Sequence, residues 1–154
     1  MIRVLVPVEA LVRLSLAAIY FALEFAKRHP AKVYFLILAG AEAELVPEKS
    51  ADPRKLQEGE LFAQLLERAR QQQVEVEVLH SQEDYLTAVR RVVLQQGIDD
   101  LVVAVPPLAD PSYHLVQRRL EQLRHRVPCH IITVKPKEAG SAGTFRQPPQ
   151  KPEG

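Results

Sequence analysis

Five short runs of apolar residues, rich in valine and isoleucine, recur along the chain and constrain its fold more than any other feature. They occupy residues 3–8, 32–38, 74–79, 100–105 and 129–134. Four of the runs show no regular alternation, which is typical of strands buried on both faces of a parallel sheet. The third run, VEVEVL, alternates apolar with charged residues, so we expect that strand at an edge of the sheet.

Amphipathic helical patterns fill the gaps between these runs. Apolar side chains recur there at spacings of three and four residues, so that each pattern covers one face of a helix. The first predicted helix covers residues 11–26. The apolar stripes of the other three are Leu61, Phe62, Leu65, Leu66 and Ala69, then Tyr85, Leu86, Val89, Val92 and Val93, and finally Val116, Leu120, Leu123 and Val127.

Helix start and stop signals agree with these patterns. Asp52–Pro53 and Asp110–Pro111 each place an N-cap acceptor before a proline that suits the first helical position. Ser81 precedes Asp84 at capping-box spacing, and Gly97 is typical of a residue that ends a helix. The boundaries therefore support the alternation of strands and helices.

Strand and helix alternate four times before the final strand, which predicts an α/β fold. By the connection rules this is an open five-stranded parallel sheet with right-handed crossovers and four helices on both faces. No helical pattern follows the fifth run, and the first run lacks the acidic pair of a phosphoacceptor site. Response-regulator and flavodoxin-like folds therefore fit less well.

The length of 154 residues fits a single domain. We expect that domain over residues 1–135, with a surface loop at 39–53 and a flexible tail at 136–154, because the tail contains four prolines, three glycines and few apolar residues. The net charge of +1 supplies little of the field that nucleic-acid binding uses. A nucleic-acid partner is therefore not expected.

Residues 11–26 form the most apolar stretch, but its 16 residues contain Arg13 and Glu24, and a membrane span needs roughly 20 apolar residues. Pro7 and Glu9 interrupt the start of the chain, and no convincing signal-peptide cleavage site follows. The lone Cys129 cannot form a disulfide within its chain. We therefore expect no membrane insertion and a cytoplasmic location.

Four segments carry a resemblance to a known family: IRVLVPVE, AKRHPAKVYFLIL, IDDLVVAV and HRVPCHIITV. With them, residues 2–134 resemble the universal stress protein family. The resemblance implies a Rossmann-like sheet with strand order 3-2-1-4-5 and a homodimer formed through the last strand. The family contains members that bind ATP and members that do not, so the resemblance leaves ATP binding open. It also allows a protein partner such as a membrane transporter.

The nucleotide-binding members carry a glycine motif after the fourth strand, G-x2-G-x9-G-[ST], which this chain lacks. The corresponding positions hold Val105, Pro107 or Leu108, Gln117 and Arg118. Pro106 and Pro107 offer no backbone N–H, and Asp110 places a carboxylate beside the amides that a phosphate would need. The sequence therefore predicts no ATP binding by that motif and no cofactor.

Glu9 follows the first strand, beside the position where open α/β sheets bind ligands. One interpretation is that Glu9 stabilises the start of the following helix. The alternative is a ligand site for ATP or another adenine nucleotide. That crevice would be lined by Val8, Glu9, Ala10, Gly40 and Val105.

Other reactive residues show no catalytic pattern. Five histidines lack metal-ligand spacing, and Cys129 begins an apolar strand where a small buried residue is expected. Ser112 and His114 lack a nucleophile elbow, and the arginines of 118–126 are expected on a solvated helix face. We therefore expect neither a metal site nor an enzyme.

The interpretation that fits these observations best is a universal-stress-protein-like regulatory or interaction protein. We expect a homodimer, because the fifth strand would lie at a sheet edge with open backbone groups. The expected interface residues are Cys129, His130, Ile131, Ile132, Thr133 and Val134. The alternative function is a nucleotide or small-ligand sensor that uses the crevice beside Glu9.

Overall fold

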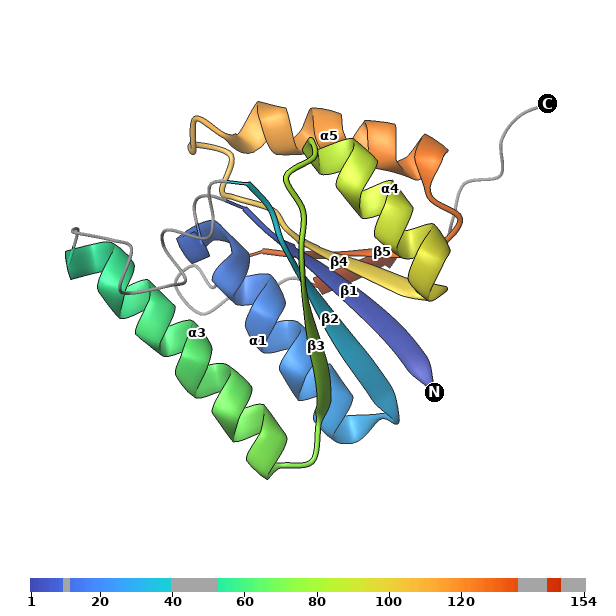
Figure 1. Ribbon diagram of the computed structural model, residues 1–154. Helices are drawn as coiled ribbons and strands as arrows, with labels where there is room; N and C mark the ends of the chain where they lie inside the picture. The colour runs from blue at the N-terminus through green and yellow to red at the C-terminus, as the bar shows by residue number, and fades with distance from the viewer. Residues whose placement is uncertain (10–11, 40–52, 136–143, 148–154) are drawn as a thin grey trace.

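A computed structural model describes residues 1–9, 12–39, 53–135 and 144–147. Strands and helices alternate along the chain, and the strands form one sheet with helices on both sides (Figure 1). The elements are β1 (Ile2–Val8), α1 (Val12–Arg28), β2 (Ala31–Ile37), α3 (Pro53–Gln71), β3 (Glu75–His80), α4 (Tyr85–Gln96), β4 (Asp100–Ala104), α5 (Tyr113–Arg126), β5 (His130–Val134) and β6 (Thr144–Gln147).

The sheet has the strand order β3-β2-β1-β4-β5-β6. The first five strands in that order are parallel, which confirms the predicted 3-2-1-4-5 arrangement and places β3 at an edge. β1 pairs with β2 along its whole length, from Ile2 opposite Ala31 to Val8 opposite Ile37. The carboxyl ends of β1 and β4, where ligands bind in such sheets, therefore lie side by side at the centre.

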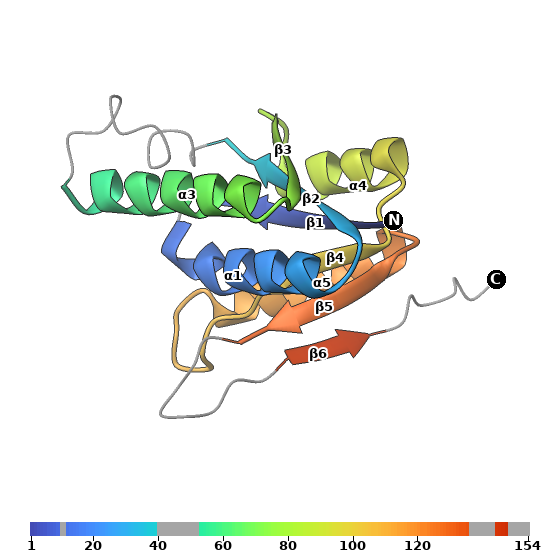
Figure 2. The same cartoon turned by 90° about the horizontal axis from the view of Figure 1, so that it is seen from below.

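The sixth strand corrects the prediction for the end of the chain. A flexible tail was expected over 136–154, but Thr144–Gln147 pair antiparallel with β5 (Figure 2). The outer edge of β5, expected to be open, is therefore occupied by the same chain. Residues 136–143 and 148–154 lie outside the described residues, as do residues 40–52 of the loop predicted at 39–53 and the candidate crevice residues Ala10 and Gly40.

Helices cover both faces of the sheet, with α1 and α3 on one side and α4 and α5 on the other (Figure 1). Side chains alternate between the two layers as the strand period requires. In β1, Val4, Val6 and Val8 belong to the core that includes α1 and α3, and Leu5 belongs to the core beneath α4 and α5. Buried valines and leucines on both faces explain why the runs lack alternation.

The ends of α4 differ in part from the prediction. Gly97 ends the helix as expected, with a φ of 62° and its N–H donating to the Val93 carbonyl. At the other end Asp84, not Ser81, is the N-cap, because the Asp84 carboxylate accepts from the Thr87 N–H at 3.1 Å. Ser81 Oγ instead accepts from the Glu83 N–H at 3.1 Å.

The start of α5 also differs from the prediction. Asp110–Pro111 was expected to be the N-cap and first helical residue, but the helix begins at Tyr113. Asp110 lies in a turn, in which its N–H donates to the Pro107 carbonyl and its own carbonyl accepts from the Tyr113 N–H. This turn precedes the helix and sets the shape of the loop after β4. Among the described helices, none is both long and apolar enough to span a membrane.

Candidate functional site

A cavity of about 200 Å³ lies at the carboxyl ends of β1 and β4. Its walls come from the ends of β1 and β4, the loop after β4, and the starts of α1, α4 and α5. Most of the lining is apolar, and its polar side chains are Glu9, Ser15, Tyr85, Ser112 and Arg119. This is the place in an open α/β sheet where ligands bind, so the cavity is the candidate site.

An ion pair spans this cavity from the sheet to α5. Nη1 of Arg119 lies 2.5 Å from Oε2 of Glu9, and the two side chains are 24% and 37% exposed. Nη1 itself is buried and has no hydrogen-bonding partner of suitable geometry among the described residues. The contact with Glu9 is therefore an ion pair without hydrogen-bond geometry, and the Nη1 N–H groups have no hydrogen bond among the described residues.

Tyr85, the first residue of α4, completes the group. The Arg119 guanidinium lies over the Tyr85 ring at 4.5 Å from the ring centre, a cation–π contact. Burial of the phenol raises the Tyr85 pKa, the nearby Glu9 charge raises it further, and Arg119 partly opposes both effects. The hydroxyl is therefore protonated at all physiological pH values and can act as a hydrogen-bond donor.

The loop between β4 and α5 forms the rim of the cavity. Pro106 lines the cavity and Leu108 is 71% exposed. Oδ1 of Asp110 accepts from the Ser112 N–H at 2.8 Å and from the Ser112 hydroxyl at 2.6 Å. A carboxylate of the chain thus takes up an amide next to the start of α5, which is the position a bound phosphate would need.

The predicted crevice residues have different outcomes. Glu9 lines the cavity. Val8 and Val105 are buried in the two cores at 0% and 2% exposure, and do not line it. Ala10 and Gly40 lie outside the described residues, so their role stays a prediction.

Sequence reasoning missed Tyr85 and Arg119 as members of the site. Arg119 was expected on a solvated helix face, but it directly precedes Leu120, which is buried in the core. The position of Arg119 beside the apolar stripe of α5 could have indicated that its side chain lies near the sheet. Its acidic partner is 110 positions earlier in the sequence, so spacing alone could not reveal the pair.

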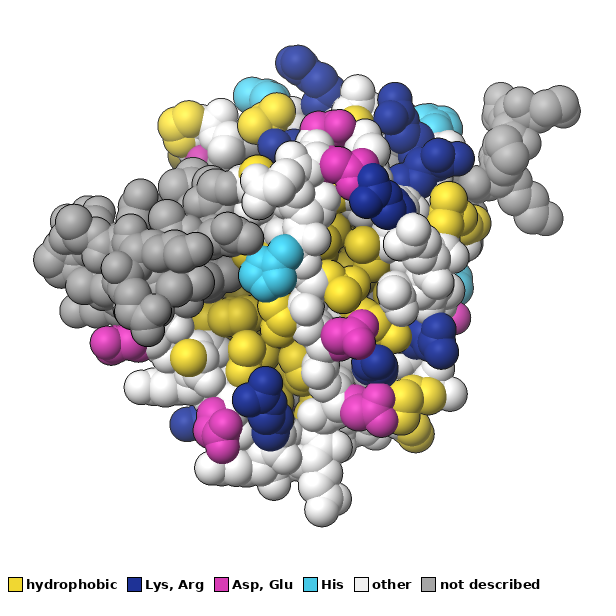
Figure 3. All heavy atoms as spheres, in the orientation of Figure 1, with side chains coloured by type: hydrophobic (Ala, Val, Ile, Leu, Met, Phe, Trp, Pro, Cys, Tyr) yellow, Lys and Arg dark blue, Asp and Glu magenta, His cyan; other side chains and the backbone are white. Residues whose placement is uncertain are grey.

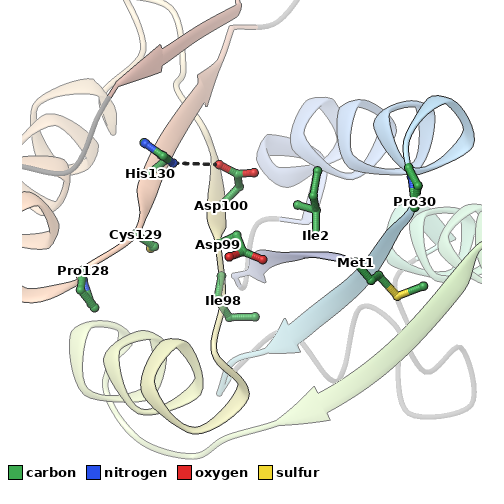
Figure 4. Close-up of a pocket in the computed structure, with 9 residues that line it drawn as sticks. All are labelled: Met1, Ile2, Pro30, Ile98, Asp99, Asp100, Pro128, Cys129 and His130. Carbon is green, nitrogen blue, oxygen red and sulfur yellow. Dashed lines mark ion pairs between the residues drawn. The ribbon is translucent and has the colours of Figure 1, made fainter.

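A second, open recess of about 600 Å³ lies at the opposite end of the sheet (Figure 4). Asp99 there accepts the Arg3 N–H at 2.8 Å, and Asp100, 2% exposed, pairs with Nδ1 of His130 at 3.6 Å. Cys129 and His130 point in different directions (Figure 4). They therefore do not form a thiol–imidazole pair.

Burial, with help from the charges of Asp100 and Asp99, raises the pKa of Cys129 to about 12. The thiol is 3% exposed, so it is a packing residue and not a nucleophile at neutral pH. Among residues whose positions are described, no group of three or more histidine, cysteine, aspartate and glutamate side chains could hold a metal ion.

No family model matches the chain, and no curated protein matches it by sequence. Solved structures do match it. A universal stress protein in complex with cAMP aligns with a TM-score of 0.63 at 16% identity, covering 88% of this chain and 98% of that one. A universal stress protein family protein from Arabidopsis thaliana with AMP bound gives 0.58 at 19% identity, covering 89% and 93%.

The universal stress protein UspA from Lactobacillus plantarum gives a TM-score of 0.56 at 21% identity, covering 86% of this chain and 96% of that one. The three alignments span nearly the whole of each chain. The chain therefore has the universal stress protein fold, as the resemblance predicted.

Proposed function

We propose that this protein is a universal-stress-protein-like regulatory or interaction protein that does not bind ATP through a glycine loop. The observation that carries the proposal is the position of Asp110, whose carboxylate accepts the Ser112 N–H and hydroxyl at the start of α5. In a phosphate-binding loop such an amide would be offered to the ligand.

The electrostatics of this loop support the proposal. Two like unit charges at 4 Å interact by about 4 kcal/mol at an effective dielectric constant of 20. A phosphate at the start of α5 would meet the Asp110 charge at short range, and Pro106 and Pro107 have no N–H groups to offset that repulsion. Binding of a triphosphate at this end of α5 is therefore unfavourable.

The size of the cavity supports the same conclusion. Pockets for drug-sized ligands have volumes of about 300–1,000 Å³, whereas this cavity has about 200 Å³. Glu9 and Arg119 meet across it, so the chain's own charges occupy the polar centre. The cavity therefore supports a regulatory or interaction role better than the binding of a nucleotide.

A second candidate function, a nucleotide or small-ligand sensor, is favoured by one specific observation. Nη1 of Arg119 is buried inside the candidate site without a hydrogen-bonding partner among the described residues. An anionic group of a ligand could accept a hydrogen bond from Nη1 and take the place of Glu9 in the ion pair. Two of the structural neighbours hold cAMP and AMP, so an adenine nucleotide is the ligand class to test.

Thermal unfolding with millimolar Mg-ATP, AMP and cAMP separates the two functions. A ligand at 100 times its dissociation constant adds about 2.7 kcal/mol to the free energy of unfolding. The proposal expects no change in midpoint with any of the three nucleotides. A rise of several degrees that disappears in Glu9→Ala or Arg119→Ala would instead establish the sensor function.

The proposed partners are a second copy of the chain or another protein, such as a membrane transporter. A homodimer through residues 129–134 remains part of the proposal, but its basis has changed because β6 pairs with the outer edge of β5. Pairing with a second copy at that edge requires β6 to leave it. A cytoplasmic location also remains a prediction.

A further inference from the structure

We propose that β6 is an intramolecular cover for the β5 edge and that its release lets a second copy of the chain pair there. The proposal rests on the proposed function only in taking a second copy as the partner. β5 is held on one side by β4, from Asp100 opposite His130 to Ala104 opposite Val134. On its other side β6 pairs with four of its five residues, from Ile131 opposite Gln147 to Val134 opposite Thr144.

The two edges of the parallel sheet are protected in different ways. The β3 edge carries Glu75 and Glu77, and Glu77 forms an ion pair with Lys32 on β2 at 3.8 Å. Figure 3, which shows the molecule from the β3 side, has acidic and basic side chains alongside the apolar ones. Charged residues on an edge strand disfavour pairing with another sheet.

The β5 edge has no acidic residue and no lysine or arginine. Its sequence, HIITV, contains four β-branched residues in succession, the type that pairs well between strands. Ile131, Ile132 and Val134 are buried, at 3%, 4% and 7% exposure. Without a covering strand this edge would be a site of strand pairing, so β6 has the role at β5 that the charges have at β3.

A second copy fits the uncovered edge by symmetry. A two-fold axis across the edge places the two β5 strands antiparallel, which is the orientation that β6 has now. With the axis at Ile132, Ile132 lies opposite Ile132 of the second copy and Ile131 lies opposite its Thr133. No like charges meet in this register. Because a second copy would pair with the same edge of β5 as β6 does, the two strands compete for the same backbone groups.

The short pairing of β6 allows it to dissociate from β5. Its ladder has only four residues, and Pro148 and Pro149 follow it directly in the sequence. Proline has no backbone N–H, so the sequence after Gln147 cannot continue to donate to the ladder. A second β5 strand offers five residues in place of four, which favours exchange at high protein concentration.

The test compares four forms of the full chain by light scattering after gel filtration, at equal micromolar concentration. Consecutive backbone N–H groups point to opposite sides of a strand, so F145P/R146P removes one donor that faces β5, whichever residue provides it. F145A/R146A is the matched control, since it removes the same side chains and keeps both N–H groups. The lock is T133C/F145C in a C129A background, because Thr133 and Phe145 are register partners.

We expect the wild type, the alanine control and the oxidised lock to have the monomer mass of 17.4 kDa, and the proline variant to have the dimer mass. A synthetic peptide of residues 141–149 should return the proline variant to monomer. A proline variant that stays monomeric, or that forms aggregates unaffected by the peptide, would overturn the proposal. So would an oxidised lock that dimerises. This experiment does not depend on nucleotide binding. A failure of the β6 proposal is therefore distinguishable from a failure of the prediction that the protein binds no nucleotide.

Discussion

Glu9 and Arg119 meet across the crevice at the centre of the sheet, with 2.5 Å between Oε2 and Nη1. Glu9 follows β1, and Arg119 lies in the second turn of α5, so one ion pair joins the sheet to the helix. The same guanidinium packs on the Tyr85 ring of α4. Three elements therefore converge on one arginine side chain.

We expect Arg119→Ala to lower the free energy of unfolding by about 1 kcal/mol. The expected loss is small because both side chains are partly exposed, and partly exposed ion pairs and cation–π contacts each contribute roughly 0.5–1 kcal/mol. Urea unfolding measures the change. The matched control is Arg118→Ala, whose exposed side chain should change the value by less than about 0.5 kcal/mol. Equal losses in the two variants would contradict a structural role for the Glu9–Arg119–Tyr85 group.

Gly97 ends α4 in the left-handed region, with a φ of 62°. A Cβ at this position would lie 3.6 Å from Nη1 of Arg3, which is ordinary contact, so there is room for a side chain. The penalty of Gly97→Ala is therefore conformational, and we expect a loss of about 1 kcal/mol in urea unfolding. Asparagine tolerates this conformation better than alanine does, so Gly97→Asn should lower the free energy of unfolding by less than Gly97→Ala. The backbone explanation is wrong if the two variants lose the same amount.

The sequence predicts the parts of this fold that depend on neighbouring residues. The apolar runs identify β1 to β5, because strand and helix periods are local properties. The helical stripes identify the buried residues of α4 and α5 apart from Ala88, but Tyr85 and Leu86 of the predicted α4 stripe are only half-buried. β6 was missed because Thr-Phe-Arg-Gln is a short segment between glycines and prolines. Its strand conformation depends on pairing with β5, whose partner residues lie 10 to 16 positions earlier in the sequence.

The candidate site was predicted only in part for a similar reason. Glu9 could be identified from its place after the first strand, since that place alone puts it at the ligand-binding edge. Arg119 and Tyr85 could not, because helix residues reach the crevice only through the way α4 and α5 pack on the sheet. The position of Asp110 was predicted to block phosphate, and the structure shows the hydrogen bonds to Ser112 that hold it there.

Cys129 is expected to resist thiol reagents in the folded protein. Burial raises its pKa to about 12 from an ordinary value of 9.0. Below pH 9 the thiolate fraction is then about a thousandfold lower than for a free thiol, and reactivity follows that fraction. Dithionitrobenzoate should react slowly with the native protein and rapidly in urea.

The same pKa shift sets a pH dependence of stability. The folded state keeps the thiol protonated, so the contribution of Cys129 to the free energy of unfolding is complete below pH 9 and is lost as the pH rises towards 12.

The control for the labelling experiment is Ala109→Cys in a Cys129→Ala background, because residue 109 is exposed. Equal labelling rates for the native wild type and the control would show that Cys129 is accessible and that its burial does not protect it.

Asp110→Asn tests the reason for the absence of ATP binding. Asparagine keeps an oxygen that can accept from Ser112 and removes the negative charge beside the start of α5. If that charge repels phosphate, the variant should gain a rise in unfolding midpoint with Mg-ATP or inorganic phosphate that the wild type lacks. Glu121→Gln on the solvent side of α5 removes a charge of the same sign and should gain no response. If Asp110→Asn and Glu121→Gln respond alike to phosphate, the charge of Asp110 does not control the site, and the prolines at 106 and 107 become the determinant to change next.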